Sequence, residues 1–408
     1  MENKKFQTQA MNENHPQYLQ AISRENELYT RRNDLRSPFG RDYTRIIFSQ
    51  AYRRLKHKTQ VFFAVEDDHI CTRSEHVNLV ESVAFTIAQN LGLNTELTKV
   101  IAVGHDLGHA PFGHGGEKIL TMLAKKYGLE DFWHERNSLH FVDHIEILED
   151  NNHNFHNLNL TYAVRDGIIS HCGEMNQKYI QRRKEMIDLN DYKHPGQYNP
   201  FTYEGCVVKM SDKIAYLARD IEDALRLGIL DEQKVMDLKN ELNQIGTYQF
   251  HAINNGSIVN YFICDVIENS CVEKGIGLSQ EAYQIMKAIM KFNYQNIYLI
   301  PRVKIHNDYV ALILESLFNF LYDYSNQCDM IHALKKDEHQ YPKLISHYLK
   351  WLDKYAVIPG HKRKNKYMNQ IIYDFIHDDN AMAKSVLDYL SGMSDQFLLQ
   401  AFNELVSF

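Results

Sequence analysis

The chain has 408 residues, of which 44% are hydrophobic, and its formal net charge at pH 7 is −7. This composition predicts a globular protein and argues against a disordered chain, and the charge gives no support to a general nucleic-acid coat. No apolar run approaches the ~20 residues that span a bilayer, and the polar N-terminal residues lack the hydrophobic region of a secretion signal. We therefore expect a cytoplasmic protein without a membrane partner.

In chain order, residues 1–30 are expected to form a polar arm. Apolar residues then recur at helical spacing in 41–55, and the β-branched and aromatic stretch 61–73 predicts one short β-hairpin. The same spacing predicts further helices, with Ser74 as the N-cap of the first: 75–91, 95–106, 137–149, 159–171, 207–228 and a set within 231–408. The loop 194–205 interrupts them, and the fold class is predicted to be all-α.

Glycine and proline are scarce, with 19 and 8 residues, which also favours long helices. The six cysteines are scattered without a C-x-x-C pair, as is typical of reduced cytoplasmic thiols. Basic residues gather between Arg31 and Lys58 and in the run HKRKNK at 361–366. Such clusters usually lie on a solvated face, but they can also bind a polyanion.

The segment GHDLGHAPFGHGGE at 104–117 combines three histidines, two carboxylates and five glycines in fourteen positions. Within it, His105 lies four residues after Ile101, so its imidazole shares the core-facing side of the helix 95–106. His76 lies four residues before Val80 and faces inward in the same way. Two inward imidazoles on separate helices raise the question of what they bind.

Carboxylates accompany both histidines. Asp106 adjoins His105, and the helix 207–228 carries a polar stripe of Asp212, Tyr216, Asp220 and Asp223. Buried carboxylates are costly unless they are paired or bound to a cation, so the combination favours one metal ion. An N/O ligand set without thiolate suits Mn, Mg, Fe, Ni, Co or Zn, and the sequence does not choose among them. Each residue alone is explained equally well as a hydrogen-bonded core residue or a wet helix face.

Four stretches resemble the deoxyguanosine triphosphatase-like branch of the HD phosphohydrolase superfamily, over most of residues 30–230. They are SPFGRDYTRIIFSQAYRRLKHKTQVF (37–62), TRSEH (72–76), HDLGHAPFGHGGE (105–117) and SDKIAYLARDIEDALRLGI (211–229). The C-terminal region is similar only in FNYQNIYLIPRV (292–303) and in its helical character. The resemblance implies an all-α HD-domain fold with a catalytic core at 31–230 and a helical region at 231–408 packed on it.

The resemblance also implies hydrolysis of a dNTP to a deoxynucleoside and inorganic triphosphate, in a homo-oligomer between a dimer and a hexamer. One divalent ion per site, Mn²⁺ or Mg²⁺ before Fe, Ni, Co or Zn, would be held by His76, His105, Asp106 and Asp212. The catalytic residues would be His114, Glu117 and His134. Arg73 and Lys213 would bind phosphates, and Gln60, Tyr216 and Asp220 would line the deoxyribose pocket.

These residue types suit that chemistry. A cation stabilises charge on the α-phosphate and positions water, while arginine and lysine hold the triphosphate. The leaving alkoxide needs a proton, which His114 can donate while Glu117, three residues on, keeps it cationic and oriented. His109 is interpreted as a supporting or structural residue. The motif departs from its relatives at Ala110 and in HCGE (171–174), and the second departure leaves the role of His171 open.

Two alternatives stay open. The first is another HD phosphohydrolase, such as a 5′-nucleotidase or a hydrolase of cyclic or polyphosphorylated nucleotides. The second is a module that senses dNTPs or binds single-stranded nucleic acid weakly through the run 361–366. The sequence does not reveal the base preference, an activating allosteric nucleotide, the oligomer order or the native metal.

Overall fold

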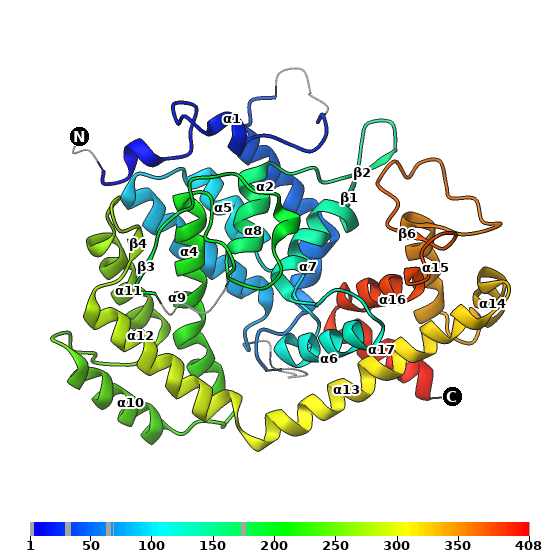
Figure 1. Ribbon diagram of the computed structural model, residues 1–408. Coiled ribbons are helices and arrows are strands. Elements are labelled where there is room, and N and C mark those ends of the chain that lie inside the picture. Colours follow the sequence, from blue (N-terminus) through cyan, green and yellow to red (C-terminus); the bar gives the residue numbers. More distant parts are fainter. Residues whose placement is uncertain (1–3, 29–33, 63–66, 68, 173–176, 408) are drawn as a thin grey trace. The chain divides into compact units, whose positions relative to one another are not determined.

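A computed structural model describes residues 4–28, 34–62, 67, 69–172 and 177–407. This part of the chain contains 17 α-helices, short 3-10 and π segments, and three sheets of only two strands each (Figure 1). The predicted all-α class is therefore confirmed. The hairpin expected at 61–73 falls partly on residues 63–66 and 68, which lie outside the described residues, and the strands that are described lie elsewhere in the chain.

The chain forms two compact units, each assembled from three separate stretches. The first unit comprises Met1–Ile47, Asp67–Asp106 and Asn159–Lys304, and the second comprises Phe48–Glu66, Leu107–Leu158 and Ile305–Phe408. These boundaries do not coincide with residues 30 and 230. The candidate residues divide accordingly, because the chain leaves the first unit directly after Asp106.

The first unit is built around four helices. Helix α4 (Arg73–Leu91) packs against α5 (Thr95–Gly104) and α9 (Tyr203–Arg226), and α5 also packs against α8 (Tyr162–Ser170). The remaining elements are α1 (Tyr18–Ala21), α2 (Pro38–Phe48), α10 (Glu232–Ile245), α11 (Asn255–Asn269), α12 (Gln280–Asn293) and the antiparallel pair β3 (Tyr179–Ile180) and β4 (Ile276–Gly277). In Figure 1, α9 passes through the middle of this unit.

Helix α4 starts at a capping box rather than at the predicted cap. The Thr72 N–H donates to the Glu75 carboxylate at 2.7 Å, and the helix begins at Arg73. Ser74 is therefore inside the first turn, and its prediction as N-cap is wrong. Further along the helix, Val80 and Val83 are almost completely buried, as their spacing predicted. The cap and the apolar stripe together fix which face of α4 turns inward.

Residues near the N-terminus pack on the first unit. Phe6 and Met11 are 0% and 1% exposed. The Phe6 N–H donates to the Leu91 carbonyl at 2.8 Å, and the Met11 N–H donates to the buried Glu204 carboxylate at 2.9 Å. These apolar side chains are the reason that part of the segment 1–30 is packed, despite its polar composition.

The second unit contains α3 (Gln50–Arg54), α6 (Gly113–Lys126), α7 (His134–His140) and most of α13 (Pro301–Tyr322). It also contains α14 (Met330–Asp337), α15 (Leu344–Tyr355), α16 (Ala381–Ser391) and α17 (Asp395–Val406), with α16 packed against α6 and α15. Its sheets are the antiparallel pair β1 (Ile147–Glu149) and β2 (Phe155–Asn157) and the parallel pair β5 (Ala356–Val357) and β6 (Tyr373–Asp374).

Two predicted helices are interrupted. The helix expected at 41–55 breaks at Ser49, whose hydroxyl accepts the Tyr52 N–H at 3.2 Å and caps α3. The helix expected at 137–149 begins earlier, as α7, and then passes through a π turn into strand β1. Apolar spacing alone does not reveal such local breaks.

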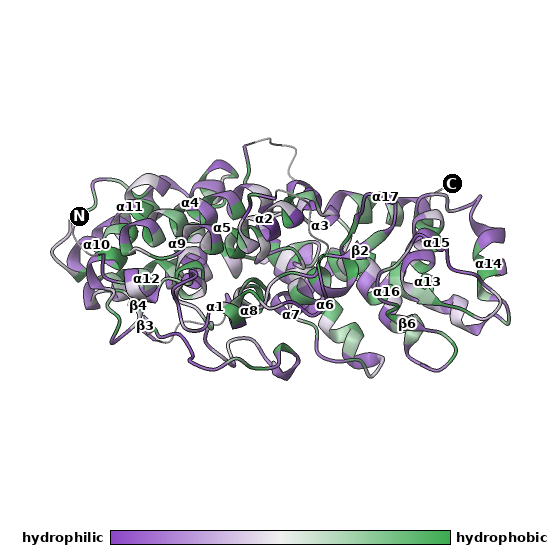
Figure 2. Ribbon diagram, turned by 90° about the horizontal axis from the view of Figure 1, so that it is seen from above, coloured by the Kyte–Doolittle hydropathy of each residue, from purple (hydrophilic) through white to green (hydrophobic). Residues whose placement is uncertain are grey.

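Most helices carry hydrophobic and hydrophilic residues along the same ribbon (Figure 2). In the described ranges, none is long and apolar enough to cross a membrane. The six cysteines, all described, are free thiols.

Candidate metal and catalytic residues

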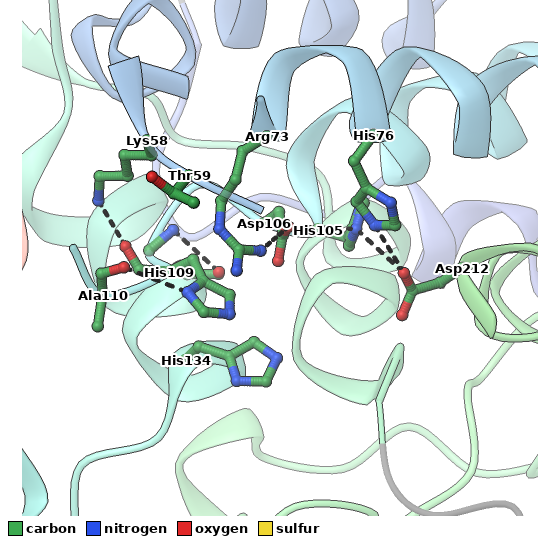
Figure 3. A network of polar contacts seen from close by, with 12 residues as sticks. Lys58, Thr59, Arg73, His76, His105, Asp106, His109, Ala110, His134 and Asp212 are labelled. Carbon is green, nitrogen blue, oxygen red and sulfur yellow. Dashed lines mark hydrogen bonds and ion pairs between the residues drawn. The ribbon is translucent and has the colours of Figure 1, made fainter. Parts of the chain in front are cut away.

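Three predicted metal ligands converge in the first unit. His76 comes from α4, His105 follows the end of α5, and Asp212 comes from α9 (Figure 3). His76 Nε2 lies 2.9 Å from Asp212 Oδ1, and His105 Nε2 lies 3.7 Å from the same oxygen. One ligand atom of each residue lies within 4.8 Å of the other two. The packing of α4 and α5 on α9 thus gathers residues that are far apart in sequence.

The protonation of His105 suits a ligand. Its Nδ1 lies 2.6 Å from the Ala102 carbonyl, which can only accept, so Nδ1 carries the proton and Nε2 presents a lone pair. The ring is 1% exposed, and Nε2 has no hydrogen-bond partner among the described residues. A buried acceptor without a donor is costly unless something binds it. A divalent cation would satisfy it.

The carboxylate of Asp212 is held in the ionised form that a cation needs. Burial alone would raise the pKa of Asp212, but the hydrogen bond from His76 and the nearby His105 outweigh it and lower the pKa well below its usual range. Asp106 Oδ2 lies 3.8 Å from His105 Nε2 and accepts a hydrogen bond from Arg73 at 2.5 Å. The donor set therefore fits an N/O-type divalent ion.

His171 lies beside this group. It is 1% exposed, its Nδ1 donates to the Ile168 carbonyl at 2.6 Å, and its ring centroid is 4.8 Å from that of His105. Ligand atoms of His105, Asp106 and His171 also lie within 4.8 Å of one another. The structure thus places this unassigned histidine next to the candidate ligands, while Gly173 and Glu174 of the same motif lie outside the described residues.

The predicted substrate residues of the first unit are Arg73, Lys213, Tyr216 and Asp220. Arg73 is 3% exposed and is bonded to Asp106, so its guanidinium is a neighbour of the candidate ligands. Lys213 is buried next to Asp212 on α9, and Tyr216 is half-buried one turn further along. Asp212, Tyr216 and Asp220 follow one another at intervals of four residues on α9, so they share one face of the helix.

Asp220 has a partner that sequence reasoning missed. Tyr298, at the end of the π segment after α12, donates its hydroxyl hydrogen to Asp220 Oδ2. Asp220 is 2% exposed, and its Oδ1 has no hydrogen-bond partner in the described part of the chain. Tyr298 lies within the stretch FNYQNIYLIPRV (292–303), which resembles the family. That resemblance was the signal in the sequence that could have pointed to a role for Tyr298. The pair offers a buried acceptor for a ligand hydroxyl.

The second unit contains the other candidate residues. His114 and Glu117 lie in the first turns of α6, with His114 Nδ1 at 3.3 Å from Glu117 Oε2. At the start of α7, His134 donates both its backbone N–H and its Nδ1–H to Glu117 Oε1, at 3.0 and 3.1 Å. Burial alone would raise the pKa of Glu117, but the bonds from His114 and His134 hold it well below its usual range. Glu117 is therefore an ionised acceptor between two histidines.

His109 packs against these histidines. Its ring stacks on His134 with centroids 4.7 Å apart and meets the His114 ring edge-on at 5.5 Å. His109 is 2% exposed, whereas the His114 side chain is 78% exposed. The interpretation of His109 as a supporting or structural residue stays a prediction. Gln60, the last predicted substrate residue, is half-buried in the same unit and follows Thr59.

The glycines of the motif permit close backbone contacts. A Cβ on Gly108 would lie 2.2 Å from the Ser138 nitrogen, and one on Gly116 would lie 1.9 Å from the Pro111 carbonyl oxygen. Both distances are far too short for a side chain, so the α6 turn and its approach to α7 require glycine at these positions.

Comparison with known proteins agrees with this geometry. The HD domain family model matches residues 73–217, a range that includes all four candidate metal ligands. A protein of Caldanaerobacter subterraneus subsp. tengcongensis is 35% identical over 326 residues, covering 80% of this chain and 84% of its own length. Another, from Desulfatibacillum aliphaticivorans, is 38% identical over 300 residues, covering 72% and 75%. Both are named deoxyguanosinetriphosphate triphosphohydrolase-like protein.

This chain belongs to that family. A third member of the deoxyguanosinetriphosphate triphosphohydrolase-like family, from Bartonella henselae, is 32% identical over 419 residues and covers 98% of this chain and 96% of its own length. The family resemblance therefore extends over the C-terminal region, where the sequence motifs are weak. The predicted membership of an HD-domain hydrolase family is confirmed.

The basic clusters of this family member are largely engaged in ion pairs and hydrogen bonds. Arg36 pairs with Asp34 at 2.8 Å, and Arg54 pairs with Glu146 at 2.9 Å. In the run 361–366, Lys364 pairs with Asp353 at 2.9 Å. Arg31 and Arg32 lie outside the described residues. These contacts favour structural roles for most of the basic side chains.

Asp220→Asn is expected to flatten the pH dependence of stability in metal-free protein. The usual pKa of the aspartate is 3.8, and burial raises the pKa of Asp220 to about 7, against the opposing effect of Tyr298. Between these values the unfolded chain has lost the proton that the folded protein keeps, so rising pH lowers the free energy of unfolding. Asparagine has no such proton. The melting temperature of the variant should therefore fall by several degrees less than that of the wild type between about pH 4 and pH 7.

Thermal melts of both proteins in the presence of a chelator measure this effect. Asp223→Asn is a useful comparison. Burial raises the pKa of Asp223 to about 6, so the pH range over which this residue makes stability depend on pH is narrower than the range for Asp220. Equal changes in melting temperature for wild type and Asp220→Asn would contradict the assignment.

Proposed function

We propose that this protein hydrolyses deoxynucleoside triphosphates to a deoxynucleoside and inorganic triphosphate, with one divalent ion, Mn²⁺ or Mg²⁺, as cofactor. The observation that carries the proposal is the buried His105 Nε2, which has no hydrogen-bond partner among the described residues and lies in a ligand group with His76 and Asp212. Family membership supports the same conclusion, since the relatives are named for triphosphohydrolase activity.

The ion would be held by His76, His105, Asp106 and Asp212. When bound, it supplies positive charge for the α-phosphate oxygens and for the activation of water. Arg73 and Lys213 would bind the triphosphate, whose charge of about −4 calls for cationic partners. Because Arg73 is bonded to Asp106, phosphate binding would require its guanidinium to be shared between the carboxylate and the substrate.

His114 would act as the general acid. Its Nδ1–H donates to the ionised Glu117, which leaves Nε2–H free to protonate the leaving 5′-oxygen. His134 donates two hydrogen bonds to Glu117 and so fixes the carboxylate that orients His114. His114 is close to the candidate ligands in the sequence, since it follows Asp106 by eight positions.

Sugar recognition would fall to Asp220 with Tyr216 and Gln60. Asp220 Oδ1 is a buried acceptor, and a deoxyribose hydroxyl can donate to it. The tyrosine hydroxyl of Tyr298 occupies the other oxygen and so fixes the orientation of the carboxylate. We further propose that the protein acts in the cytoplasm as a homo-oligomer between a dimer and a hexamer. An activating nucleotide is part of the same proposal.

Product analysis tests the function. Purified protein is incubated with each dNTP and Mn²⁺, and the phosphate products are separated by ion-exchange chromatography. We expect inorganic triphosphate and deoxynucleoside in equal amounts, and no turnover after chelation of the metal. Monophosphate or pyrophosphate as the first product would instead support another HD phosphohydrolase. Mixtures of dNTPs in the same assay test for activation by a second nucleotide.

A further inference from the structure

We propose that Asp395, the first residue of α17, is a positioning residue that holds the loop before α6 in the geometry that the catalytic His114 needs. The inference rests on the proposed function, because it concerns the same reaction. It assigns a structural role in catalysis to part of the C-terminal region. From the sequence, that region was predicted only to be helical and to pack on the core.

Asp395 joins two segments that are distant in sequence. Its side chain is buried, and the residue is 3% exposed. Oδ1 accepts the Phe112 N–H at 2.8 Å, and Oδ2 accepts the Thr59 N–H at 2.8 Å. Phe112 is the residue before α6, whose first turns carry His114 and Glu117, and Thr59 precedes Gln60. Both oxygens of one carboxylate thus hold backbone next to candidate active-site residues.

Phe112 needs such support. Its φ angle is 60°, in the left-handed region that a bulky residue adopts only when the surroundings enforce it. Gly113 follows with a φ of 61°, so the chain turns sharply into α6. If the bond to Asp395 is lost, Phe112 can relax towards an ordinary conformation. That relaxation would change the direction from which α6 presents His114.

Lys58 reinforces the same connection. It is 3% exposed, and its Nζ donates to the His109 carbonyl at 2.5 Å (Figure 3). The same Nζ donates to the Ser391 carbonyl at 3.2 Å. Ser391 ends α16 and Asp395 begins α17. The residues that connect these segments are called the brace: Lys58, Thr59, His109, Phe112, Ser391 and Asp395. The brace links the end of α16 and the start of α17 to both ends of the loop 109–112.

Both oxygens of the Asp395 side chain act as acceptors in this arrangement. Two N–H donors point at one carboxylate, and a carboxylate can accept from both. Asparagine has nearly the same shape but only one accepting atom, so its amide N–H₂ would face one of the two backbone donors. Asp395→Asn therefore forces either the Thr59 or the Phe112 backbone to move, while the volume of the side chain is kept.

The test compares Asp395→Asn with wild type, alone and in a His114→Ala background. Alone, the substitution should lower kcat by about 10- to 100-fold, the range that small misplacements of catalytic groups produce, with little change in KM or metal content. In the His114→Ala background it should cause no further loss, because the group through which it acts is absent. An equal loss in both backgrounds would overturn the inference and indicate a merely structural role.

The matched control is Asp329→Asn, which changes the N-cap of α14, where Asp329 accepts the His332 N–H at 3.0 Å. It should leave kcat unchanged. If Asp395→Asn does not fold, Lys58→Met breaks the other half of the brace and should give the same pattern. Wild type that releases no triphosphate would refute the proposed function. Hydrogen exchange then still decides the inference, since Asp395→Asn should speed exchange at 109–117 and unchanged rates would overturn it.

Discussion

Asp212→Ala is expected to empty the metal site and to abolish the release of triphosphate. Asp212 is the carboxylate closest to both imidazoles, at 2.9 Å from His76 and 3.7 Å from His105. Its removal leaves the two imidazoles with less negative charge beside them to balance a divalent ion. Even residues that only support a ligand cost about 10- to 100-fold in metal affinity when lost, so removal of a ligand should cost at least about 100-fold.

Metal content per chain, measured after dialysis by elemental analysis, gives this result independently of activity. Asp223→Ala is the matched control, because Asp223 lies on the same helix, accepts the Cys71 N–H at 3.1 Å and is not among the assigned ligands. The control should lose some stability but keep its metal. A fully metallated and active Asp212→Ala protein would refute the assignment of the ligands.

The convergence of His76, His105 and Asp212 was accessible from the sequence. Each lies four residues from a buried position or at the start of a polar stripe, and helical periodicity then fixes the direction of its side chain. What periodicity supplies is the face of a helix. It does not supply the partner on another element, and the grouping of these three candidate ligands was predictable because all three faces turn to one core.

Other features depend on contacts that no local pattern specifies. Tyr298 lies 78 residues after Asp220, and Asp395 lies 283 residues after Phe112. Their importance comes from tertiary packing alone. The break at Ser49 and the π turn after α7 were also missed, because a single capping hydroxyl or one extra residue per turn leaves the apolar spacing almost unchanged.

His114→Ala is expected to lower turnover by about 10²- to 10⁴-fold, to a small but measurable rate, while metal content stays near that of the wild type. The His114 side chain is 78% exposed and contacts Glu117, and His114 is not among the assigned ligands. Its loss removes the proton for the leaving 5′-oxygen, and a general acid contributes about 10²- to 10⁴-fold in rate. The fall should appear in kcat, since protonation of the leaving group matters in the transition state rather than in substrate binding.

The chain offers a close control in His377→Ala. His377 is 77% exposed and its Nδ1 lies 2.8 Å from Asp374, three residues away, so it repeats the exposed histidine–carboxylate pair outside the candidate site. Its loss should leave kcat unchanged, which would show that the effect at position 114 comes from catalysis and not from the removal of an exposed ion pair. Parallel loss of metal and activity in His114→Ala would instead place His114 among the ligands. Substitution of a proton donor that does not bind the ion should leave the metal content unchanged.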